Sequence, residues 1–182
     1  RQADGRDGTV LPRQGRQHDR RMTQQESPMT DIRPLGPQDR NSWETLYRGY
    51  ADFYRVETDA EKLASLFGWL LDPGHVCEGI VAMDAESRLI GLAHFRAMPS
   101  PLRGSEVGFL DDLFVDPACR GNGAAEALLR HIDTIALARG WPVVRWITRD
   151  NNYRARGLYD RLALRSDWIT YEMTGASVGR NS

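Results

Sequence analysis

A glycine-containing turn near the middle of the chain could bind a phosphate group. The turn follows a strand-like apolar segment that ends at Pro117, and a helical pattern begins directly after it. A strand, a tight turn and a helix in this order aim consecutive backbone N–H groups and the positive end of the helix dipole at one point. Gly121 and Gly123 have no Cβ, so the backbone can approach a ligand closely. The residues expected to line this site are Arg120, Gly121, Asn122, Gly123, Ala124, Ala125 and Glu126.

Other designs for binding phosphates or metals do not fit the sequence. A dinucleotide-binding loop would need a third glycine where the chain has Glu126, and a P-loop would need Gly-Lys-Ser/Thr. Cys77 and Cys119 lack the spacing of zinc ligands, so we expect no metal site. We interpret His94, within a strand-like run, as a packed histidine. A plain strand–turn–helix without a ligand is the alternative interpretation of the loop.

Two adjacent carboxylates, Asp111 and Asp112, precede the loop and could act as a general base. Strict alternation along a strand puts Asp111 on a largely apolar face. The other members of that face are Val107, Phe109, Leu113 and Val115. There, a carboxylate is either paired or has a raised pKa, and an unpaired one can remove the proton of an amine. Pairing of either aspartate with one of the many arginines is the alternative.

These residues lie within an alternation of strand and helix patterns. We expect strands at 30–33, 80–82, 89–95, 106–115, 143–148 and 168–173, and helices at 38–54, 59–70, 123–139 and 153–162. Pro37 suits a first helical turn, and Gly140 suits a helix C-terminus. This order predicts an α/β fold with a mixed, mostly antiparallel sheet, helices on both of its faces and one parallel strand pair.

The composition fits a single globular domain without a nucleic-acid or membrane partner. The 182 residues carry a formal net charge of −1, so no basic surface is expected. No apolar run approaches the ~20 residues that span a bilayer, and we expect a cytoplasmic protein with free thiols. Residues 1–28 lack aromatic residues and a hydrophobic period, which predicts a disordered extension before a domain at 29–174 and a flexible tail at 175–182.

Two motifs give the chain a family resemblance. Residues 120–125, RGNGAA, match Arg/Gln-x-x-Gly-x-Gly/Ala, and residues 152–159, NYRARGLY, match Asn-x-x-Ala-x-x-Leu-Tyr. The chain therefore resembles the GCN5-related N-acetyltransferases (GNAT superfamily). The strand LDDLFV at 110–115 is similar to that of the branch containing spermidine/spermine and yeast histone/polyamine acetyltransferases.

The resemblance implies acetyl-CoA as the cofactor. It also implies that the parallel strands splay apart to admit the pantetheine arm. The loop at 120–126 would hold the pyrophosphate, and the residues expected along the rest of the coenzyme are Leu113, Phe114, Val115, Asn152, Ala155 and Tyr159. A bulge, common in this strand of the family, would bring Asp112 instead of Asp111 into the base position.

The resemblance also implies that Tyr159 is the general acid that protonates the leaving thiolate. Asn152 lies seven residues earlier, close to two helical turns, so both side chains face the same way. A simple core stripe through Ala155, Leu158 and Tyr159 is the alternative.

The acceptor pocket is expected along the helix and loop at 43–61. Tyrosine faces together with the negative charges of Asp52 and Glu57 could hold a cationic amine. The residues expected at this site are Tyr47, Tyr50, Tyr54 and Asp111. An amphipathic helix with a solvated charged face is the alternative.

The sequence therefore predicts an acetyl-CoA-dependent N-acetyltransferase that acts by direct attack in a ternary complex. We favour a small polyamine-like or amino-acid-like amine as acceptor, ahead of a protein N-terminus or lysine. The branch resemblance also implies a homodimer. A coenzyme-A-binding module without catalysis, acting as a sensor or interaction partner, is the alternative from another class. A different nucleotide-binding fold is a third hypothesis.

Overall fold

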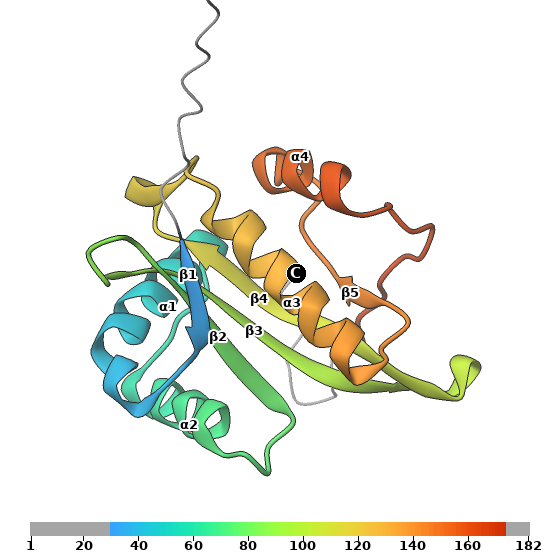
Figure 1. Ribbon diagram of the computed structural model, residues 1–182, viewed down its shortest axis with the longest axis horizontal. Coiled ribbons are helices and arrows are strands. Elements are labelled where there is room, and N and C mark those ends of the chain that lie inside the picture. Colours follow the sequence, from blue (N-terminus) through green and yellow to red (C-terminus); the bar gives the residue numbers. More distant parts are fainter. Residues whose placement is uncertain (1–29, 174–182) are drawn as a thin grey trace, which may run out of the picture.

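The computed structural model describes residues 30–173 as one five-stranded sheet with helices packed on it (Figure 1). The elements are β1 (Asp31–Pro34), α1 (Arg40–Tyr54), α2 (Ala60–Leu71), β2 (Cys77–Met83), β3 (Leu89–Ser100), β4 (Ser105–Val115), α3 (Ala124–Arg139), β5 (Val144–Trp146) and α4 (Tyr153–Leu162). The strands lie in chain order, antiparallel except for the parallel pair β4–β5. The predicted mixed fold is confirmed.

Two hydrophobic cores hold the helices on opposite faces of the sheet. On one face α3 buries Leu128, Ile132 and Ala136, which recur every four residues and so form a single stripe. On the other face α1 and α2 share a core that includes Trp43, Leu63 and Phe67. Each fully buried leucine or isoleucine stabilises the fold by ~1.5–3 kcal/mol relative to an exposed one.

Local signals in the sequence place the ends of the helices. Asp59 caps α2, because its carboxylate accepts the Lys62 N–H at 2.8 Å. Gly140 ends α3 with a φ of 68°, a left-handed conformation that glycine adopts at little cost. Pro37 opens a short 3-10 turn that leads into α1. The predicted start at Pro37 and the predicted cap at Gly140 are both confirmed.

A bulge in β4 gives the two adjacent aspartates different positions in the sheet. Asp112 pairs with His94, but the next pair joins Leu110 to Phe95, so Asp111 is the extra residue with no partner on β3. Beyond the bulge the alternation changes phase. Leu110, Leu113 and Val115 all pack in the core under α3, whereas Phe114 packs in the core under α1 and α2. The strict alternation that grouped Asp111 with Leu113 and Val115 was therefore wrong.

The parallel pair separates directly at this bulge. Its register joins residues 108–110 of β4 to residues 144–146 of β5, and within residues 30–173 nothing pairs with β4 beyond Leu110 on that side. The strand expected at 143–148 is only three residues long. The sheet thus has the splayed pair that the family resemblance implies.

The last expected strand, Trp168–Met173, does not form. In the described part of the chain these residues make no strand, and the Trp168 side chain is 78% exposed. The apolar pattern there predicts a strand, but the edge strand β5 offers only three residues to pair with. The expected extension at 1–28 and the tail at 175–182 lie outside the described residues. No helix within residues 30–173 is both long and apolar enough to cross a bilayer.

Candidate active site

The loop between β4 and α3 presents a row of free backbone donors. Gly121 and Gly123 have φ values of 96° and 89°, which explains why glycine stands at both positions. The first N–H bonded into the helix is that of Ala127, to the Gly123 carbonyl at 2.9 Å. Among the described residues no acceptor faces the N–H groups of residues 121–126. This loop can therefore hold an anion.

A side-chain oxygen in the same loop also lacks a partner. Asn122 Oδ1 is buried, and no donor within residues 30–173 reaches it. Such a group is costly to bury unsatisfied, so a donor on a bound ligand would stabilise it.

Other residues expected around the loop serve to fix it in place. Arg120 Nε donates to the Val115 carbonyl at 3.1 Å, and its guanidinium lies 5.7 Å from the centre of the Phe114 ring. Arg120 therefore braces the loop against β4. Glu126 pairs with Arg130 on the surface of α3 at 2.7 Å. Ala124 is buried in the core under α3, and Ala125 packs against that core.

The splayed end of β4 offers backbone groups to an extended ligand. The Asp116 N–H donates to the Ile90 carbonyl on the β3 side at 2.9 Å. Because backbone groups alternate along a strand, those of Leu113 and Val115 point the other way, into the gap next to β5. Arg120 already occupies the Val115 carbonyl, which leaves the Val115 N–H and both groups of Leu113 for a ligand.

Asp111 and Asp112 have different partners. Asp111 forms an ion pair with Arg96 at 3.0 Å, and Arg96 also lies 5.0 Å from the centre of the Phe109 ring. Burial raises the pKa of Asp111, and the Arg96 charge opposes that rise. Asp112 Oδ2 instead lies 2.9 Å from Nδ1 of His94. No arginine or lysine of the described chain pairs with Asp112.

Three tyrosines of α1 extend from Asp112 toward the end of the helix. Rings of Tyr47 and Tyr50 lie 5.6 Å apart, and those of Tyr50 and Tyr54 lie 5.0 Å apart. Burial, followed by the negative charge of Asp112, raises the pKa of both Tyr47 and Tyr50. Both phenols therefore keep their protons at neutral pH and can donate hydrogen bonds.

Tyr159 reaches the same region from α4. Its ring makes an edge contact with Trp146 at 5.3 Å. Burial, with a smaller contribution from the nearby Tyr54 phenol, raises the pKa of Tyr159 to about 12. Asn152 stands just before the first turn of α4, and its amide donates to Thr148 Oγ1 at 3.1 Å, while Ala155 is half-buried on the helix. The ends of α1 and α4 thus converge across the gap in the sheet.

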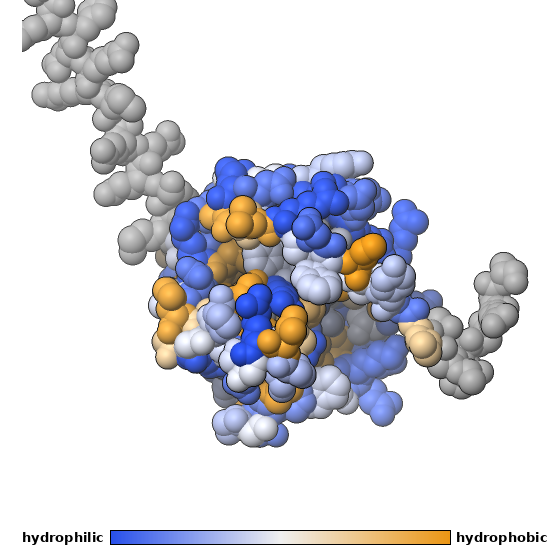
Figure 2. Space-filling model, turned by 90° about the vertical axis from the view of Figure 1, so that its right-hand side faces the viewer, coloured by the Kyte–Doolittle hydropathy of each residue, from blue (hydrophilic) through white to orange (hydrophobic). Residues whose placement is uncertain are grey.

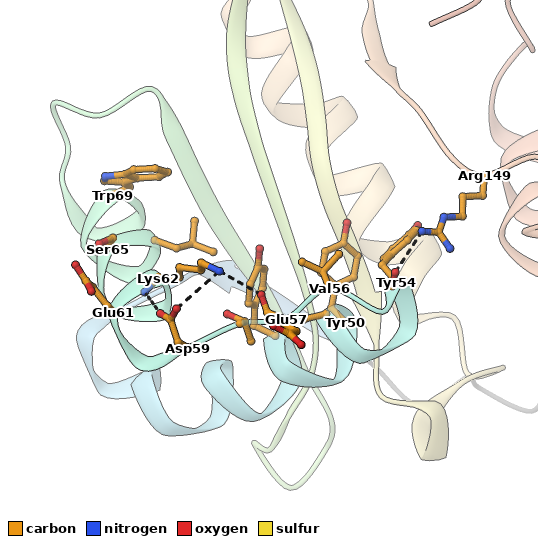
Figure 3. A pocket seen from close by; sticks show the side chains of 14 residues that line it. Tyr50, Tyr54, Val56, Glu57, Asp59, Glu61, Lys62, Ser65, Trp69 and Arg149 are labelled. Atoms are coloured by element: carbon orange, nitrogen blue, oxygen red, sulfur yellow. Dashed lines mark hydrogen bonds and ion pairs between the residues drawn. The ribbon is translucent and has the colours of Figure 1, made fainter. Parts of the chain in front are cut away.

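A cavity of about 860 Å³ opens beside the tyrosines (Figure 3). It is lined by Tyr47, Tyr50, Ala51, Tyr54, Val56, Glu57, Thr58, Asp59, Glu61, Lys62, Ser65, Leu66, Trp69 and Arg149. Trp69 and Arg149 stand at its opposite ends (Figure 3). Arg149 donates to the Tyr54 carbonyl at 3.2 Å and stacks on the Tyr54 ring. Asp52, Asp111 and Asp112 do not line this cavity, but the charge of Asp112 acts on Tyr47 and Tyr50, which do.

Sequence reasoning missed Trp43, Arg96 and Arg149 as parts of the site and gave His94 only a packing role. His94 is indeed buried, but it also touches Asp112, 18 residues away, and Trp43, 51 residues away. The pairing of β3 with β4 could have placed His94 beside Asp112, had the bulge been located. No local pattern marks Trp43 or Arg149.

Comparisons with known proteins agree with the fold. The model of the acetyltransferase (GNAT) family matches residues 43–163. A D-amino-acid N-acetyltransferase of Saccharomyces cerevisiae is 28% identical over 145 residues, which cover 79% of this chain and 90% of the relative.

Two solved structures share the architecture. A ribosomal-protein-alanine N-acetyltransferase from Brucella melitensis biovar Abortus 2308 is 24% identical with a TM-score of 0.69, over 81% of this chain and 99% of that one. An aminoglycoside N-acetyltransferase in complex with CoA is 20% identical with a TM-score of 0.67, over 81% and 95%. At these identities the two structures show the fold alone.

Proposed function

Since the chain belongs to the acetyltransferase (GNAT) family, whose members use acetyl-CoA, we propose that it acetylates the primary amine of a small, amino-acid-like molecule. When bound, acetyl-CoA supplies an activated acetyl thioester. One observation carries the proposal. The bulge in β4 puts a carboxylate at the point where the sheet opens, and the same strand leads into a loop of free backbone donors.

The residues that hold the coenzyme follow from the free donors. N–H groups of residues 121–126 bind the pyrophosphate, and the α3 dipole favours its negative charge. The free backbone groups of Leu113 and Val115 pair with the amide-bearing arm, and Asn152 and Ala155 flank it from α4. Phe114 contributes its backbone, because its side chain packs in the core under α1 and α2.

Asp112 is the general base. Alkyl amines are protonated at neutral pH, so the nucleophile must first lose a proton, directly or through a water. Asp111, although burial raises its pKa, is the weaker candidate because both of its carboxylate oxygens already accept hydrogen bonds from Arg96. Asp112 would take one proton of the ammonium group, and the neutral nitrogen would then bond to the acetyl carbon as the carbon–sulfur bond breaks. The second proton that the nitrogen must lose would pass to the departing thiolate.

Tyr159 donates to the leaving sulfur. Its pKa of about 12 keeps the phenol protonated at neutral pH. A thiol has a pKa near 8.5, so complete proton transfer from such a phenol runs uphill. Tyr159 therefore assists mainly through a hydrogen bond to the developing thiolate, and its contribution is smaller than that of Asp112.

The cavity beside the α1 tyrosines takes the acceptor. Arg149 offers a cation for a carboxylate, as does Lys62, whose pairing with Asp59 at 3.7 Å is loose. Val56, Leu66 and Trp69 supply apolar surface for a side chain. This arrangement suits an amino acid, and the yeast relative is named for that substrate class.

A polyamine-like acceptor is the second candidate. Glu57, Asp59 and Glu61 line the same cavity and could hold a second cationic nitrogen. The resemblance of residues 110–115 to the polyamine-acetylating branch favours this reading, as do the tyrosine faces.

The decisive experiment measures thiol release from acetyl-CoA with D- and L-amino acids, polyamines, aminoglycosides and peptides, and coenzyme binding by calorimetry on the same sample. Turnover with free amino acids, lost when the carboxylate is amidated, is the expected result. Preference for polyamines would instead indicate that the acidic residues of the cavity, Glu57, Asp59 and Glu61, bind the acceptor. Binding without turnover on any amine would contradict the proposed acceptor class. Light scattering and cell fractionation test the homodimer and the cytoplasmic location that we also propose.

A further inference from the structure

A buried histidine connects Asp112 to the core under α1. His94 Nδ1 lies 2.9 Å from Asp112 Oδ2, and His94 Nε2 lies 3.0 Å from Nε1 of Trp43. His94 is 1% exposed and Trp43 is fully buried. Solvent therefore cannot replace either contact, and the three side chains form one continuous hydrogen-bonded row.

The indole decides which nitrogen of His94 carries the proton. A tryptophan N–H is a donor only, so Nε2 of His94 must accept from it and carries no hydrogen. The hydrogen of the neutral ring is then on Nδ1, where it is donated to Asp112. His94 is thus held as a neutral donor with a single tautomer.

Packing also prevents the His94 ring from turning. The Tyr47 ring lies 5.5 Å from the His94 ring and stacks on Trp43 at 5.3 Å. The direct pairing of His94 with Asp112 across β3 and β4 fixes the backbone on both sides of the contact. One oxygen of the Asp112 carboxylate is therefore anchored at a defined place.

We propose that His94, locked in its tautomer by Trp43, is a positioning residue for the base Asp112. The inference rests on the proposed role of Asp112 in acetyl transfer. His94 orients the carboxylate toward the amine without adding a positive charge, which would oppose uptake of the proton. Arg96 does add such a charge beside Asp111, so the two neighbouring aspartates have separate roles: one is held ready to accept a proton and the other is neutralised.

Steady-state kinetics of three variants test whether His94 positions Asp112. H94L removes the donor, whereas H94N retains an amide N–H near the position of Nδ1. Misplacing a reacting group by about 1 Å costs up to ~100-fold, so we expect kcat of H94L to fall about 10- to 100-fold, with the KM for acetyl-CoA unchanged. H94N should recover most of that loss. W43F should lower kcat in the same direction, because the tautomer is released.

A matched control separates positioning from general damage to the core. Trp141 is also a buried tryptophan, but it packs against Phe95 in the core under α3 and makes no contact with the row. W141F should therefore keep its kcat. Equal losses of kcat in W43F and W141F, or an H94N variant as slow as H94L, would overturn the proposal.

The tautomer can be measured without any turnover. Nitrogen-15 NMR of labelled imidazole rings should assign hydrogen to Nδ1 of His94 in the free wild-type protein. In W43F the ring should no longer be restricted to that tautomer. A His94 ring with its hydrogen on Nε2, or an imidazolium at neutral pH, would refute the proposed positioning of Asp112 by His94 even if the enzyme is active. Conversely, the expected tautomer in a protein that acetylates no amine would refute the proposed function and leave the geometry intact.

Discussion

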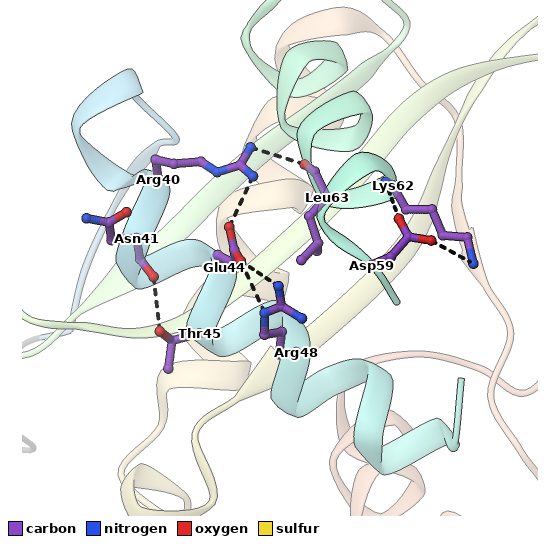
Figure 4. Close-up of polar contacts among 8 residues, drawn as sticks. All are labelled: Arg40, Asn41, Glu44, Thr45, Arg48, Asp59, Lys62 and Leu63. Carbon is purple, nitrogen blue, oxygen red and sulfur yellow. Dashed lines mark hydrogen bonds and ion pairs between the residues drawn. The ribbon is translucent and has the colours of Figure 1, made fainter. Parts of the chain in front are cut away.

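The two helices that bring tyrosines to the site are held in the fold very differently. α1 buries Trp43, Leu46 and Ala51, and Glu44 on its surface binds both Arg40 and Arg48 (Figure 4). Arg40 also donates to the Leu63 carbonyl at 3.2 Å, which ties α1 to α2 (Figure 4). By contrast, no residue of α4 is fully buried, and the helix follows a strand of three residues.

This difference divides the site into a fixed half and a weakly held half. The base, its histidine and the α1 tyrosines stand on two packed cores, whereas Tyr159 and Asn152 stand on the sparsely packed side of the gap. On the face that carries α4, apolar side chains interrupt the hydrophilic surface (Figure 2). Segments with few buried contacts open at lower free energy than the rest of a fold. We therefore expect substitutions in the two halves to affect different observables.

The largest effect is expected in the fixed half, at Asp112. D112N keeps the shape of the side chain but cannot accept the amine proton, so kcat/KM should fall about 1,000-fold, within the range of general base catalysis. The free energy of unfolding should change little. Initial rates at saturating acetyl-CoA measure the loss. D111N is the matched comparison, and a greater loss in D111N than in D112N would move the base to Asp111.

Removal of the Tyr159 hydroxyl tests the weakly held half. Y159F should lower kcat about 10- to 50-fold, less than D112N, because a phenol with a pKa of about 12 stabilises the thiolate without transferring its proton completely. Tyr153, which is 74% exposed on the same helix, provides the control. Y153F should keep the wild-type kcat. If Y159F is as slow as D112N, the two halves contribute equally and the division fails.

The ion pair under α1 gives the fixed half a dependence on pH. Asp39 is 4% exposed and accepts two bonds from Arg33, at 2.6 and 2.7 Å, and one from the Gly36 N–H at 2.8 Å. The hydrogen bond from Arg33 lowers the pKa of Asp39 below its ordinary value. A depressed pKa stabilises the fold above the unfolded pKa, and that stability is lost as the pH falls through the folded one.

Urea denaturation of D39N measures this contribution. At pH 6 the variant should be less stable than wild type by about 1–3 kcal/mol, the value of buried hydrogen bonds to a charged group. The difference should shrink below about pH 4. D150N removes an ion pair on the side of α4, where Asp150 is 87% exposed, and should cost less than about 0.5 kcal/mol. A difference for D39N that persists unchanged at pH 3 would contradict the assignment.

Some of these elements could be predicted from the sequence, and the exceptions have physical reasons. Apolar residues that recur every three or four positions predicted α1 to α4 closely, since each helix carries the signals for its own buried face and its own ends. The bulge at Asp111 could not be located, because it depends on how β3 and β4 pair and not on the residues of β4 alone. The hydrogen bonds from Trp43 to His94 and from His94 to Asp112 could not be predicted either, because they join residues far apart in the sequence. The strand expected at 168–173 had the right pattern, but the edge strand β5 is only three residues long.

The smallest predicted effect asks whether α4 unfolds by itself. Gly157 lies within α4 and is exposed, and outside the helix's own backbone and its chain neighbours an added Cβ would meet no atom within 4 Å. G157A should stabilise the helix by about 0.5–1 kcal/mol, because glycine loses more conformational freedom on folding than alanine. If α4 melts before the rest of the fold, hydrogen exchange of its amides should slow severalfold while the midpoint of the main unfolding transition stays unchanged. An equal gain in free energy for α4 exchange and for the main transition would mean that both halves unfold together, and the contrast between α1 and α4 would then be one of packing alone.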